Sequence, residues 1–328
     1  MNNLHEIARD LAVPGKGILA ADESLKTAKK RLESVGAEDN EENRRMYREL
    51  FFTADGIGDY LSGVILFDET FWQKSSDGTP FVKLLESKGV MPGIKVDMST
   101  APMPNFPGEE FTQGFDGLAQ RLEKYVEGGA KFTKWRNVIR IGDTMPSDMN
   151  LREMAIGMAH YAAAVQAVGM VPMVEPEVLL EGSHTIEQAE EVTTKTLQRM
   201  FEEIKNYNVD VAGLVLKSSM VLAGDKAPKQ STPEEVAEAT LRTFEASVPE
   251  EVPSIVFLSG GQTTQQATDN LQVIAQKNNG PWQISFSYAR ALQGPSLTIW
   301  AGKSENIPAA QEKFIERLKE TAAARDGK

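Results

Sequence analysis

Eight short hydrophobic runs recur along the 328-residue chain, and each predicts a β-strand. The runs are Gly17–Asp22, Ser62–Phe67, Gly93–Asp97, Ala130–Arg136, Val171–Glu177, Val211–Lys217, Ser254–Gly260 and Trp282–Tyr288. Successive runs end 28 to 45 residues apart, which leaves room for one helix after each strand. Nearly continuous apolar strands that alternate with helices are typical of a parallel sheet covered on both faces. Eight such units predict a closed (β/α)8 barrel.

The segments between the runs have the polar and apolar spacing of helices. Thr185 and Gln188 form a capping box in front of an apolar stripe that extends to Ile204. Thr232 followed by proline predicts another helix start, and the stretch from Pro308 to about Ala324 predicts a terminal helix. No linker or low-complexity tract interrupts this pattern. We therefore expect one α/β domain over residues 1–328, a TIM barrel with extra N- and C-terminal helices.

Composition narrows the class of protein. Hydrophobic residues make up 41% and charged residues 25% of the chain, as in ordinary globular proteins. No apolar run approaches twenty residues and the N-terminus lacks a signal sequence, so we expect no membrane contact and a cytoplasmic location. A formal net charge of −12 argues against a nucleic-acid partner. Cysteine is absent, which excludes disulfides and thiolate metal ligands.

Polar and charged residues lie at the ends of most of the runs. They are Asp22, Lys95 with Asp97, Lys134 with Arg136, Glu175 with Glu177, Lys217, Ser259 with Gly260 and Gly261, and Arg290. The carboxyl ends of the strands of a parallel barrel meet at one mouth, where barrel enzymes have their active sites. A single charged strand end would be a solvated rim residue. Several of both signs at one mouth predict a functional site.

Lys217 is the most informative of these residues because it ends a run that is apolar on both faces. Burying an ammonium is costly, and that cost favours the neutral amine, which attacks carbonyl groups and forms Schiff bases. Lys134, two strands away, would add positive charge that favours the neutral amine further. The alternative is a lysine whose ammonium simply reaches water at the strand end.

Three carboxylates complete the candidate catalytic set. Asp22 is expected to bond a substrate hydroxyl and steer its proton. Glu175 and Glu177 are two positions apart, so both point to one face of their strand. Crowded carboxylates resist ionising together, so one of the pair would hold a proton near neutral pH and act as a general acid or base. Alternatively the two glutamates only neutralise the lysines, and their spacing leaves both interpretations open.

Two groups of residues are candidates for binding phosphate. Ser259 and Gly260 precede a helix start, so backbone N–H groups and the helix dipole would face an anion there, and Arg290 would complete the site. The second group is placed on the opposite half of the ring and comprises Lys95, Arg136, Thr27 and Arg31. Two phosphate sites across one mouth predict a bisphosphate substrate.

Metal and cofactor chemistry find little support in the sequence. The three histidines, His5, His160 and His184, lie apart, and none ends a hydrophobic run. We therefore expect neither a metal nor another cofactor. The electrophile must then come from the protein, and a Schiff base supplies one.

These features in this order resemble the class I, Schiff-base type of fructose-1,6-bisphosphate aldolase. The resemblance covers about residues 4–318 and rests on GKGILAADES (15–24), GVILFDET (63–70), GIKVD (93–97), AKFTKWR (130–136), VPMVEPEVL (171–179), LVLK (214–217), FLSGGQ (257–262) and FSYARAL (286–292). It implies a Schiff base on the lysine of LVLK. The same resemblance assigns site roles to Asp22, Lys134, Glu175 and Glu177, and substrate contacts to Lys95, Ser259, Gly260 and Arg290.

The sequence departs from the animal members of that family at several positions. Leu-Lys-Thr27 replaces Thr-Gly-Ser, Ser218-Ser219 replaces Pro-Asn, and Ala289 stands where glycine is usual. The animal enzymes end in a tyrosine used in proton exchange, whereas the last tyrosine here is Tyr288. We expect Glu177 to serve in proton exchange instead.

The resemblance implies metal-independent, reversible cleavage of fructose 1,6-bisphosphate into dihydroxyacetone phosphate and glyceraldehyde 3-phosphate. The expected partner is a small sugar phosphate, and a homo-oligomer is a separate expectation that the sequence does not decide. Two alternatives stay open at this point. One is a Schiff-base aldolase for another phosphorylated sugar, and the other is a non-catalytic role in binding a protein through an acidic outer surface.

Overall fold

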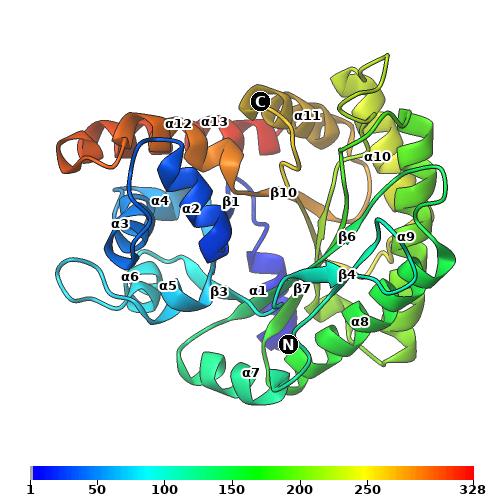
Figure 1. Cartoon of the computed structure of the whole chain (residues 1–328), viewed down its shortest axis with the longest axis horizontal. Helices are drawn as coiled ribbons and strands as arrows, with labels where there is room; N and C mark the ends of the chain where they lie inside the picture. Colours follow the sequence, from blue (N-terminus) through cyan, green and yellow to red (C-terminus); the bar gives the residue numbers. More distant parts are fainter. Residues whose placement is uncertain (1–2) are drawn as a thin grey trace.

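The eight hydrophobic runs form parallel strands that close into a barrel in the computed structural model, which describes residues 3–328 (Figure 1). The barrel strands are β1 (Gly17–Ala21), β2 (Leu61–Leu66), β3 (Met91–Lys95), β6 (Phe132–Ile139), β7 (Val171–Val178), β8 (Val215–Ser218), β9 (Ser254–Phe257) and β10 (Gln283–Tyr288). Around the ring they lie in the order β1-β10-β9-β8-β7-β6-β3-β2. The predicted fold class is therefore confirmed.

Helices surround this barrel and cover its outer face (Figure 1). They are α1 (Asn3–Asp10), α2 (Leu25–Glu33), α3 (Glu41–Phe52), α4 (Ile57–Tyr60), α5 (Asp68–Trp72), α6 (Phe81–Ser87), α7 (Leu118–Glu127), α8 (Asp148–Ala167), α9 (Ile186–Asn206), α10 (Pro233–Ser247), α11 (Thr264–Lys277), α12 (Arg290–Trp300) and α13 (Ile307–Arg325), with 3-10 turns at Val211–Gly213 and Ser304–Asn306. The capping boxes predicted at Thr185 and Thr232 are both present. The extra N- and C-terminal helices are α1 and α13.

Some strand boundaries differ from the sequence prediction. The first residues of the run 211–217 form a 3-10 turn, because the Asp210 carboxylate accepts a hydrogen bond from the backbone N–H of Ala212. Strand β6 continues three residues past Arg136, so Lys134 and Arg136 lie within a long strand. A hairpin of β4 (Thr100–Pro102) and β5 (Glu110–Thr112), which the pattern did not predict, lies between β3 and β6.

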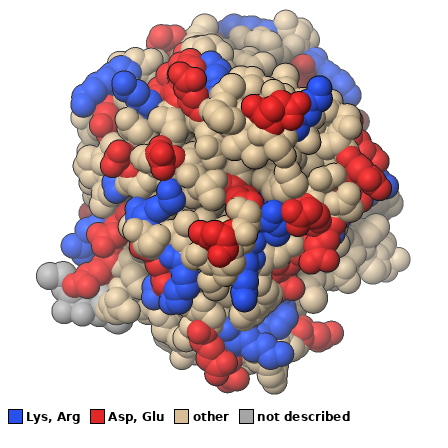
Figure 2. All heavy atoms as spheres, turned by 90° about the vertical axis from the view of Figure 1, so that its left-hand side faces the viewer, with Lys and Arg blue, Asp and Glu red and all other residues tan. Residues whose placement is uncertain are grey.

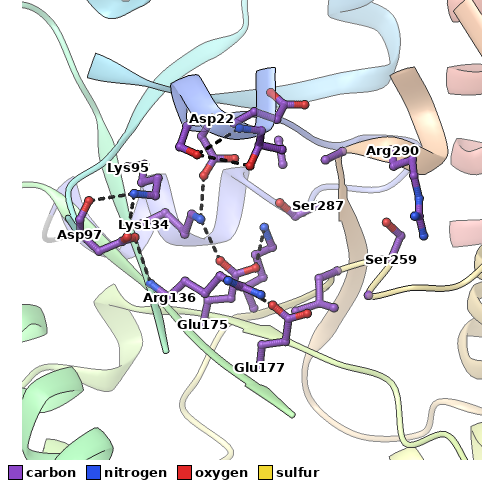
Figure 3. Close-up of a pocket in the computed structure, with 18 of the residues that line it drawn as sticks. Asp22, Lys95, Asp97, Lys134, Arg136, Glu175, Glu177, Ser259, Ser287 and Arg290 are labelled. Carbon is purple, nitrogen blue, oxygen red and sulfur yellow. Dashed lines mark hydrogen bonds and ion pairs between the residues drawn. The ribbon is translucent and has the colours of Figure 1, made fainter. Parts of the chain in front are cut away.

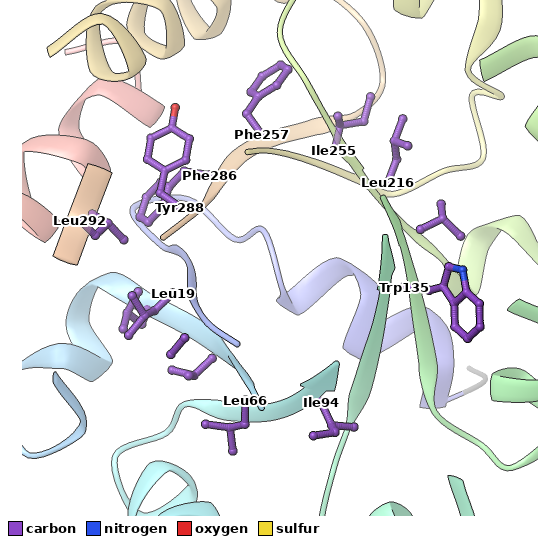
Figure 4. Close-up of a cluster of buried hydrophobic side chains, with 14 of the residues drawn as sticks. Leu19, Leu66, Ile94, Trp135, Leu216, Ile255, Phe257, Phe286, Tyr288 and Leu292 are labelled. Atoms are coloured by element: carbon purple, nitrogen blue, oxygen red, sulfur yellow. The ribbon is translucent and has the colours of Figure 1, made fainter. Parts of the chain in front are cut away.

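Alternation along each strand divides the hydrophobic side chains into two clusters. Ile18 and Ala20 point into the barrel and pack in an interior cluster with Phe132 and Val215. Leu19, between them, belongs to the larger cluster that fills the space between strands and helices (Figure 4). The side-chain period of two therefore decides, for each strand, which residues can reach the barrel axis.

Helix α1 closes the amino-terminal end of the barrel. Leu4 and Ala8 of this helix pack in the interior cluster. The Ser254 hydroxyl, at the start of β9, donates a 2.7 Å hydrogen bond to the carbonyl oxygen of Ala8. The Ser62 hydroxyl on β2 likewise donates to the carbonyl oxygen of Leu11, at 2.6 Å. The interior is thus plugged at this end, and only the carboxyl ends of the strands remain open for chemistry.

Within residues 3–328, no helix is both long enough and apolar enough to cross a bilayer.

Two glycine substitutions are expected to change the free energy of unfolding in opposite directions. A Cβ added at Gly93 on β3 would lie 2.3 Å from the Phe132 ring inside the barrel. We expect Gly93→Ala to lower the free energy of unfolding by about 1–3 kcal/mol through overpacking. Gly157→Ala, in the middle of α8, would meet Phe115 at an ordinary 3.6 Å and should stabilise by about 0.5–1 kcal/mol. Urea denaturation of both variants checks this, and a Gly93→Ala protein as stable as Gly157→Ala would contradict it.

Candidate active site

The carboxyl ends of the strands surround a cavity of about 460 Å³. Its wall contains every residue that the sequence nominated, namely Asp22, Thr27, Arg31, Lys95, Lys134, Arg136, Glu175, Glu177, Lys217, Ser259, Gly260 and Arg290. Figure 3 shows Ser259 and Arg290 on one side of this cavity and Lys95 with Asp97 on the other. The sequence therefore identified a set of residues that the fold brings together.

The charged residues continue the inward rows of the strands. On β7, Val171 and Met173 pack in the interior cluster, and Glu175 and Glu177 follow at the same spacing of two. Lys217 stands two residues after the interior Val215 on β8. Side chains alternate between the two faces of a strand, so every second residue points toward the barrel axis. On these strands the inward residues are apolar near α1 and charged at the mouth. This alternation is the local reason that the catalytic candidates converge.

Four of these groups form a buried chain of alternating charge. Lys134 Nζ lies 2.6 Å from Asp22 Oδ2 and 3.0 Å from Glu175 Oε2. The other oxygen of Glu175 lies 2.9 Å from Lys217 Nζ. The side chains of Lys134, Glu175 and Lys217 are each 4% exposed. Two carboxylates and two ammonium groups thus compensate each other away from water, with Glu175 between the two lysines.

The chain of charges shifts the pKa values of its members. Burial alone would raise the pKa of Asp22, but the charges of Lys134 and Lys217 outweigh it and hold that pKa well below its usual range. The pKa of Glu175 is lowered for the same reason, by the same two lysines. The pKa of Lys134, which burial would lower, is raised by Asp22 and Glu175. Glu175 is therefore ionised near neutral pH, as a base requires.

The two glutamates lie on one face as predicted, but they contact different cations. Glu177 forms a close ion pair with the Arg136 guanidinium, whereas Glu175 contacts the lysines. Burial would lower the pKa of Arg136, but the charge of Glu177 raises it above its usual value. Crowding does not keep Glu175 protonated, because the charges of the two lysines outweigh it. The alternative interpretation, that the glutamates neutralise the lysines, describes the contacts of Glu175, whereas Glu177 pairs with an arginine.

Arg290 differs from the other cations of the cavity. Lys95 pairs with Asp97 at 2.6 Å, and Arg31 pairs with Glu23 at 3.0 Å. The Arg290 guanidinium donates to the backbone carbonyl of Gln262 at 3.2 Å and, among residues 3–328, has no carboxylate partner. An anion in the cavity could therefore pair with Arg290 without displacing a carboxylate.

The loop after β9 lies beside Arg290 and has the backbone that the phosphate prediction requires. Gly260 and Gly261 have φ values of 27° and 85°, in the region that favours glycine. A Cβ on Gly260 would also approach the Leu258 side chain to 2.5 Å. Glycine therefore lets the backbone after Ser259 turn at the edge of the cavity, as an anion site needs.

The predicted division into two opposite phosphate groups is wrong for Arg31. This residue follows β1, which pairs with β10 in the closed barrel, and it donates a hydrogen bond to Gln293 on the same helix as Arg290. Arg31 and Arg290 also line a second cavity of about 500 Å³ between α2 and α12. The closure of the barrel itself, which makes the first and last strands neighbours, would have revealed this grouping.

Three further serines in the cavity wall, Ser24, Ser99 and Ser287, were not nominated from the sequence. Ser24 caps α2, where its hydroxyl lies 3.2 Å from the Thr27 hydroxyl. Ser287 is fully buried on β10, its hydroxyl has no hydrogen-bond partner among the described residues, and it lines the cavity (Figure 3). The polar positions Ser285 and Ser287 alternate within an otherwise apolar run, and this pattern was the available signal.

Over residues 3–328, no cluster of three or more His, Cys, Asp or Glu side chains has a geometry suited to a metal ion.

A charged cavity at the carboxyl ends of the strands of a closed (β/α)8 barrel defines the class of barrel enzymes. The family model described as fructose-bisphosphate aldolase class-I matches residues 3–328. The chain belongs to the class-I fructose-bisphosphate aldolase family, a family of carbon–carbon lyases of glycolysis. The resemblance stated from the sequence motifs is therefore confirmed.

Individual relatives agree with this assignment. A probable fructose-bisphosphate aldolase class 1 of Xanthomonas axonopodis pv. citri is 48% identical over 100% of this chain and 98% of its own length. The cytosolic fructose-bisphosphate aldolase 6 of Arabidopsis thaliana is 50% identical over 96% of this chain and 88% of its own. The structure of Plasmodium falciparum fructose-bisphosphate aldolase, solved with TRAP and a small-molecule inhibitor, superposes with a TM-score of 0.98 at 42% identity. That match covers 99% of this chain and 94% of the other.

The lowered pKa of Asp22 predicts a specific acid sensitivity. A carboxylate with a lowered folded pKa contributes stability that is present above its unfolded pKa, about 3.9, and is lost as the pH falls through the folded value. The Asp22→Asn protein should therefore be less stable than the unmodified protein at pH 7, by roughly 3 kcal/mol. Below about pH 4 its stability should fall less steeply than that of the unmodified protein. Urea denaturation at several pH values tests this. Asp55→Asn, at an exposed carboxylate, is the control, and equal pH slopes for all three proteins would contradict the prediction.

Proposed function

We propose that Lys217 is the nucleophile with which this aldolase reversibly cleaves fructose 1,6-bisphosphate into dihydroxyacetone phosphate and glyceraldehyde 3-phosphate. The observation that carries the proposal is a buried lysine whose Nζ lies 2.9 Å from an ionised glutamate at the mouth of the barrel. A lysine that reached water would leave this assignment without support, but the Lys217 side chain is 4% exposed. Membership of the class I family supports the same chemistry.

Glu175 is suited to the proton transfers that form the Schiff base. It accepts a proton from the Lys217 ammonium, and the neutral amine attacks the C2 carbonyl of the open-chain sugar to give a carbinolamine. The same carboxyl then gives its proton to the C2 hydroxyl, which leaves as water while the iminium forms. This transfer leaves the net charge of the site unchanged, because Lys217 and Glu175 both become neutral while Lys134 stays paired with Asp22.

Asp22 is the candidate base for the cleavage step. It takes the proton of the C4 hydroxyl, the C3–C4 bond breaks, and the bonding electrons move to the iminium nitrogen to give an enamine. Glyceraldehyde 3-phosphate leaves, the enamine is protonated at C3, and water releases dihydroxyacetone phosphate from Lys217. The lowered pKa of Asp22 keeps it ionised before this step. Protonation by Glu177 stays a prediction.

The cations of the cavity suit a substrate with two phosphates. Arg290 with Ser259 and Gly260 would hold one phosphate, and Lys95 with Arg136 lies across the mouth for the other (Figure 3). Arg31 would add to the Arg290 side, since both line the second cavity, and Thr27 in the cavity wall would add a hydroxyl. No metal or other cofactor enters this scheme, because the iminium is the electron sink.

The cellular location is inferred by analogy with named relatives. Relatives from Arabidopsis thaliana and Pisum sativum are named as cytosolic and cytoplasmic enzymes, which supports a cytoplasmic location for this chain. A homo-oligomer stays a prediction, and light scattering on the purified protein would measure its mass.

The two alternatives are separable by experiment. A Schiff-base aldolase for another phosphorylated sugar would prefer that sugar in a panel of ketose phosphates. A non-catalytic role through an acidic surface has no support on the face shown in Figure 2, where acidic and basic side chains lie interspersed. An inactive Lys217→Met protein that still fulfilled the cellular role would favour that alternative.

The Schiff base predicts a covalent adduct on one peptide. Borohydride reduction in the presence of dihydroxyacetone phosphate should add mass to the peptide that contains Lys217, because reduction converts the iminium to a stable amine. Peptide mapping by mass spectrometry gives the position. Lys217→Met should remove both the label and the activity. A label on Lys134 instead, or no label at all, would overturn the assignment.

The uncompensated charge of Arg290 predicts a dominant contribution to phosphate binding. Arg290→Ala should raise the KM for fructose 1,6-bisphosphate roughly ten- to a hundredfold, since a charge-assisted hydrogen bond contributes about 1.5–3 kcal/mol. The control is the same comparison with a ketose that lacks the phosphate held by Arg290, for which the loss should be smaller. Equal losses for both substrates would count against this phosphate site.

A further inference from the structure

Arg31 is held to the wall of the cavity through one nitrogen of its guanidinium. Its Nη1 lies 3.0 Å from Glu23 Oε1, 2.7 Å from Gln293 Oε1 and 3.3 Å from the Tyr47 hydroxyl. None of the contacts of Arg31 among residues 3–328 uses Nη2 or Nε. The side chain is 18% exposed and lines the cavity, so these donors are left for a ligand.

Gln293 is the neutral member of this arrangement and is fully buried on α12. Its amide oxygen accepts hydrogen bonds from Arg31 Nη1 and, at 2.9 Å, from the Tyr47 hydroxyl. Its amide nitrogen donates to the carbonyl oxygen of Ala20 at 3.2 Å. Because one end faces donors and the other an acceptor, the amide has a single orientation that satisfies both. One side chain thereby joins α12 to α2, α3 and β1.

The charges around Arg31 leave it net positive. Glu23 pairs with Arg31 and also with the buried Arg48, whose Nη1 lies 2.5 Å from Glu23 Oε2. Two guanidinium groups share one carboxylate, and the Gln293 amide adds no charge. A neutral acceptor therefore orients Arg31 without cancelling the charge that would attract a phosphate.

We propose that Gln293 is a positioning residue for the substrate phosphate, which it orients through Arg31. By fixing Nη1 in the wall, it turns the remaining donors of Arg31 toward the cavity. Gln293 stands three residues after Arg290 on α12, so the same contact sets the spacing between the two guanidinium groups that line both cavities. The inference rests on the proposed function, in which Arg31 and Arg290 bind one end of the bisphosphate.

The first experiment replaces the acceptor while keeping the length of the side chain. Gln293→Met should raise the KM for fructose 1,6-bisphosphate roughly tenfold, because the guanidinium of Arg31 loses its charge-assisted anchor, while kcat stays within about twofold. Ser296→Ala is the matched control: Ser296 is also fully buried on α12, and its hydroxyl has no hydrogen-bond partner among the described residues. Its KM should be unchanged, and a Ser296→Ala protein with the same KM as Gln293→Met would overturn the proposal.

A double-mutant comparison shows whether Gln293 acts through Arg31. Arg31→Ala alone should raise KM at least as much as Gln293→Met, and adding Gln293→Met to it should change KM less than twofold. Full additivity of the two effects would overturn the positioning role. If Arg31→Ala leaves KM unchanged, the assignment of Arg31 to the phosphate fails instead, and the two failures are distinguishable.

Two milder variants keep the test valid if Gln293→Met folds poorly. Gln293→Asn retains the amide but is one methylene too short to reach Arg31 and Ala20 together, so KM should rise as for methionine. Tyr47→Phe removes one donor to the amide oxygen and leaves the bond from Arg31, so KM should rise less than threefold. Thermal unfolding measured alongside identifies a general loss of structure. A KM for Gln293→Asn equal to that of the unmodified protein would contradict the proposal.

Discussion

The structure depends above all on the buried chain Asp22–Lys134–Glu175–Lys217. Each of these charges would be costly away from water, and removing one would leave its neighbours uncompensated. These four side chains are two carboxylates and two ammonium groups, so their charges sum to zero at the centre of the mouth. Because the four residues come from β1 or its adjoining loop, β6, β7 and β8, the same contacts link the elements that the chemistry needs together. The same four residues are therefore needed both to hold these strands together and to carry out the proposed chemistry.

Much of the site was predictable because one rule, side-chain alternation, acts at short range. Lys217 follows Val215 on the inward row, and Glu175 follows Met173 in the same way, so a strand prediction also predicts which residues reach the mouth. The family motifs supplied the roles of these residues.

The features of the site that the sequence did not predict depend on contacts between segments that are distant in the chain. Arg31 meets Gln293, 262 positions later, only because the barrel closes between β1 and β10. The ionisation of Glu175 likewise depends on two lysines from other strands, whereas strand spacing alone left the role of the two glutamates open. The β4–β5 hairpin has strands of three residues, too short to stand out as a hydrophobic pattern.

The two sides of the cavity differ in how their cations are compensated, and this difference has a consequence for the proposed reaction. Arg290 meets a phosphate without giving up a carboxylate partner, whereas Arg136 is already paired with Glu177. A phosphate bound at Arg136 competes with Glu177 for the same guanidinium. Under the proposed function, substrate binding therefore weakens the ion pair between Arg136 and Glu177. Occupancy of the second phosphate site would thus release the carboxylate that is predicted to serve in proton exchange, which links phosphate binding to that step.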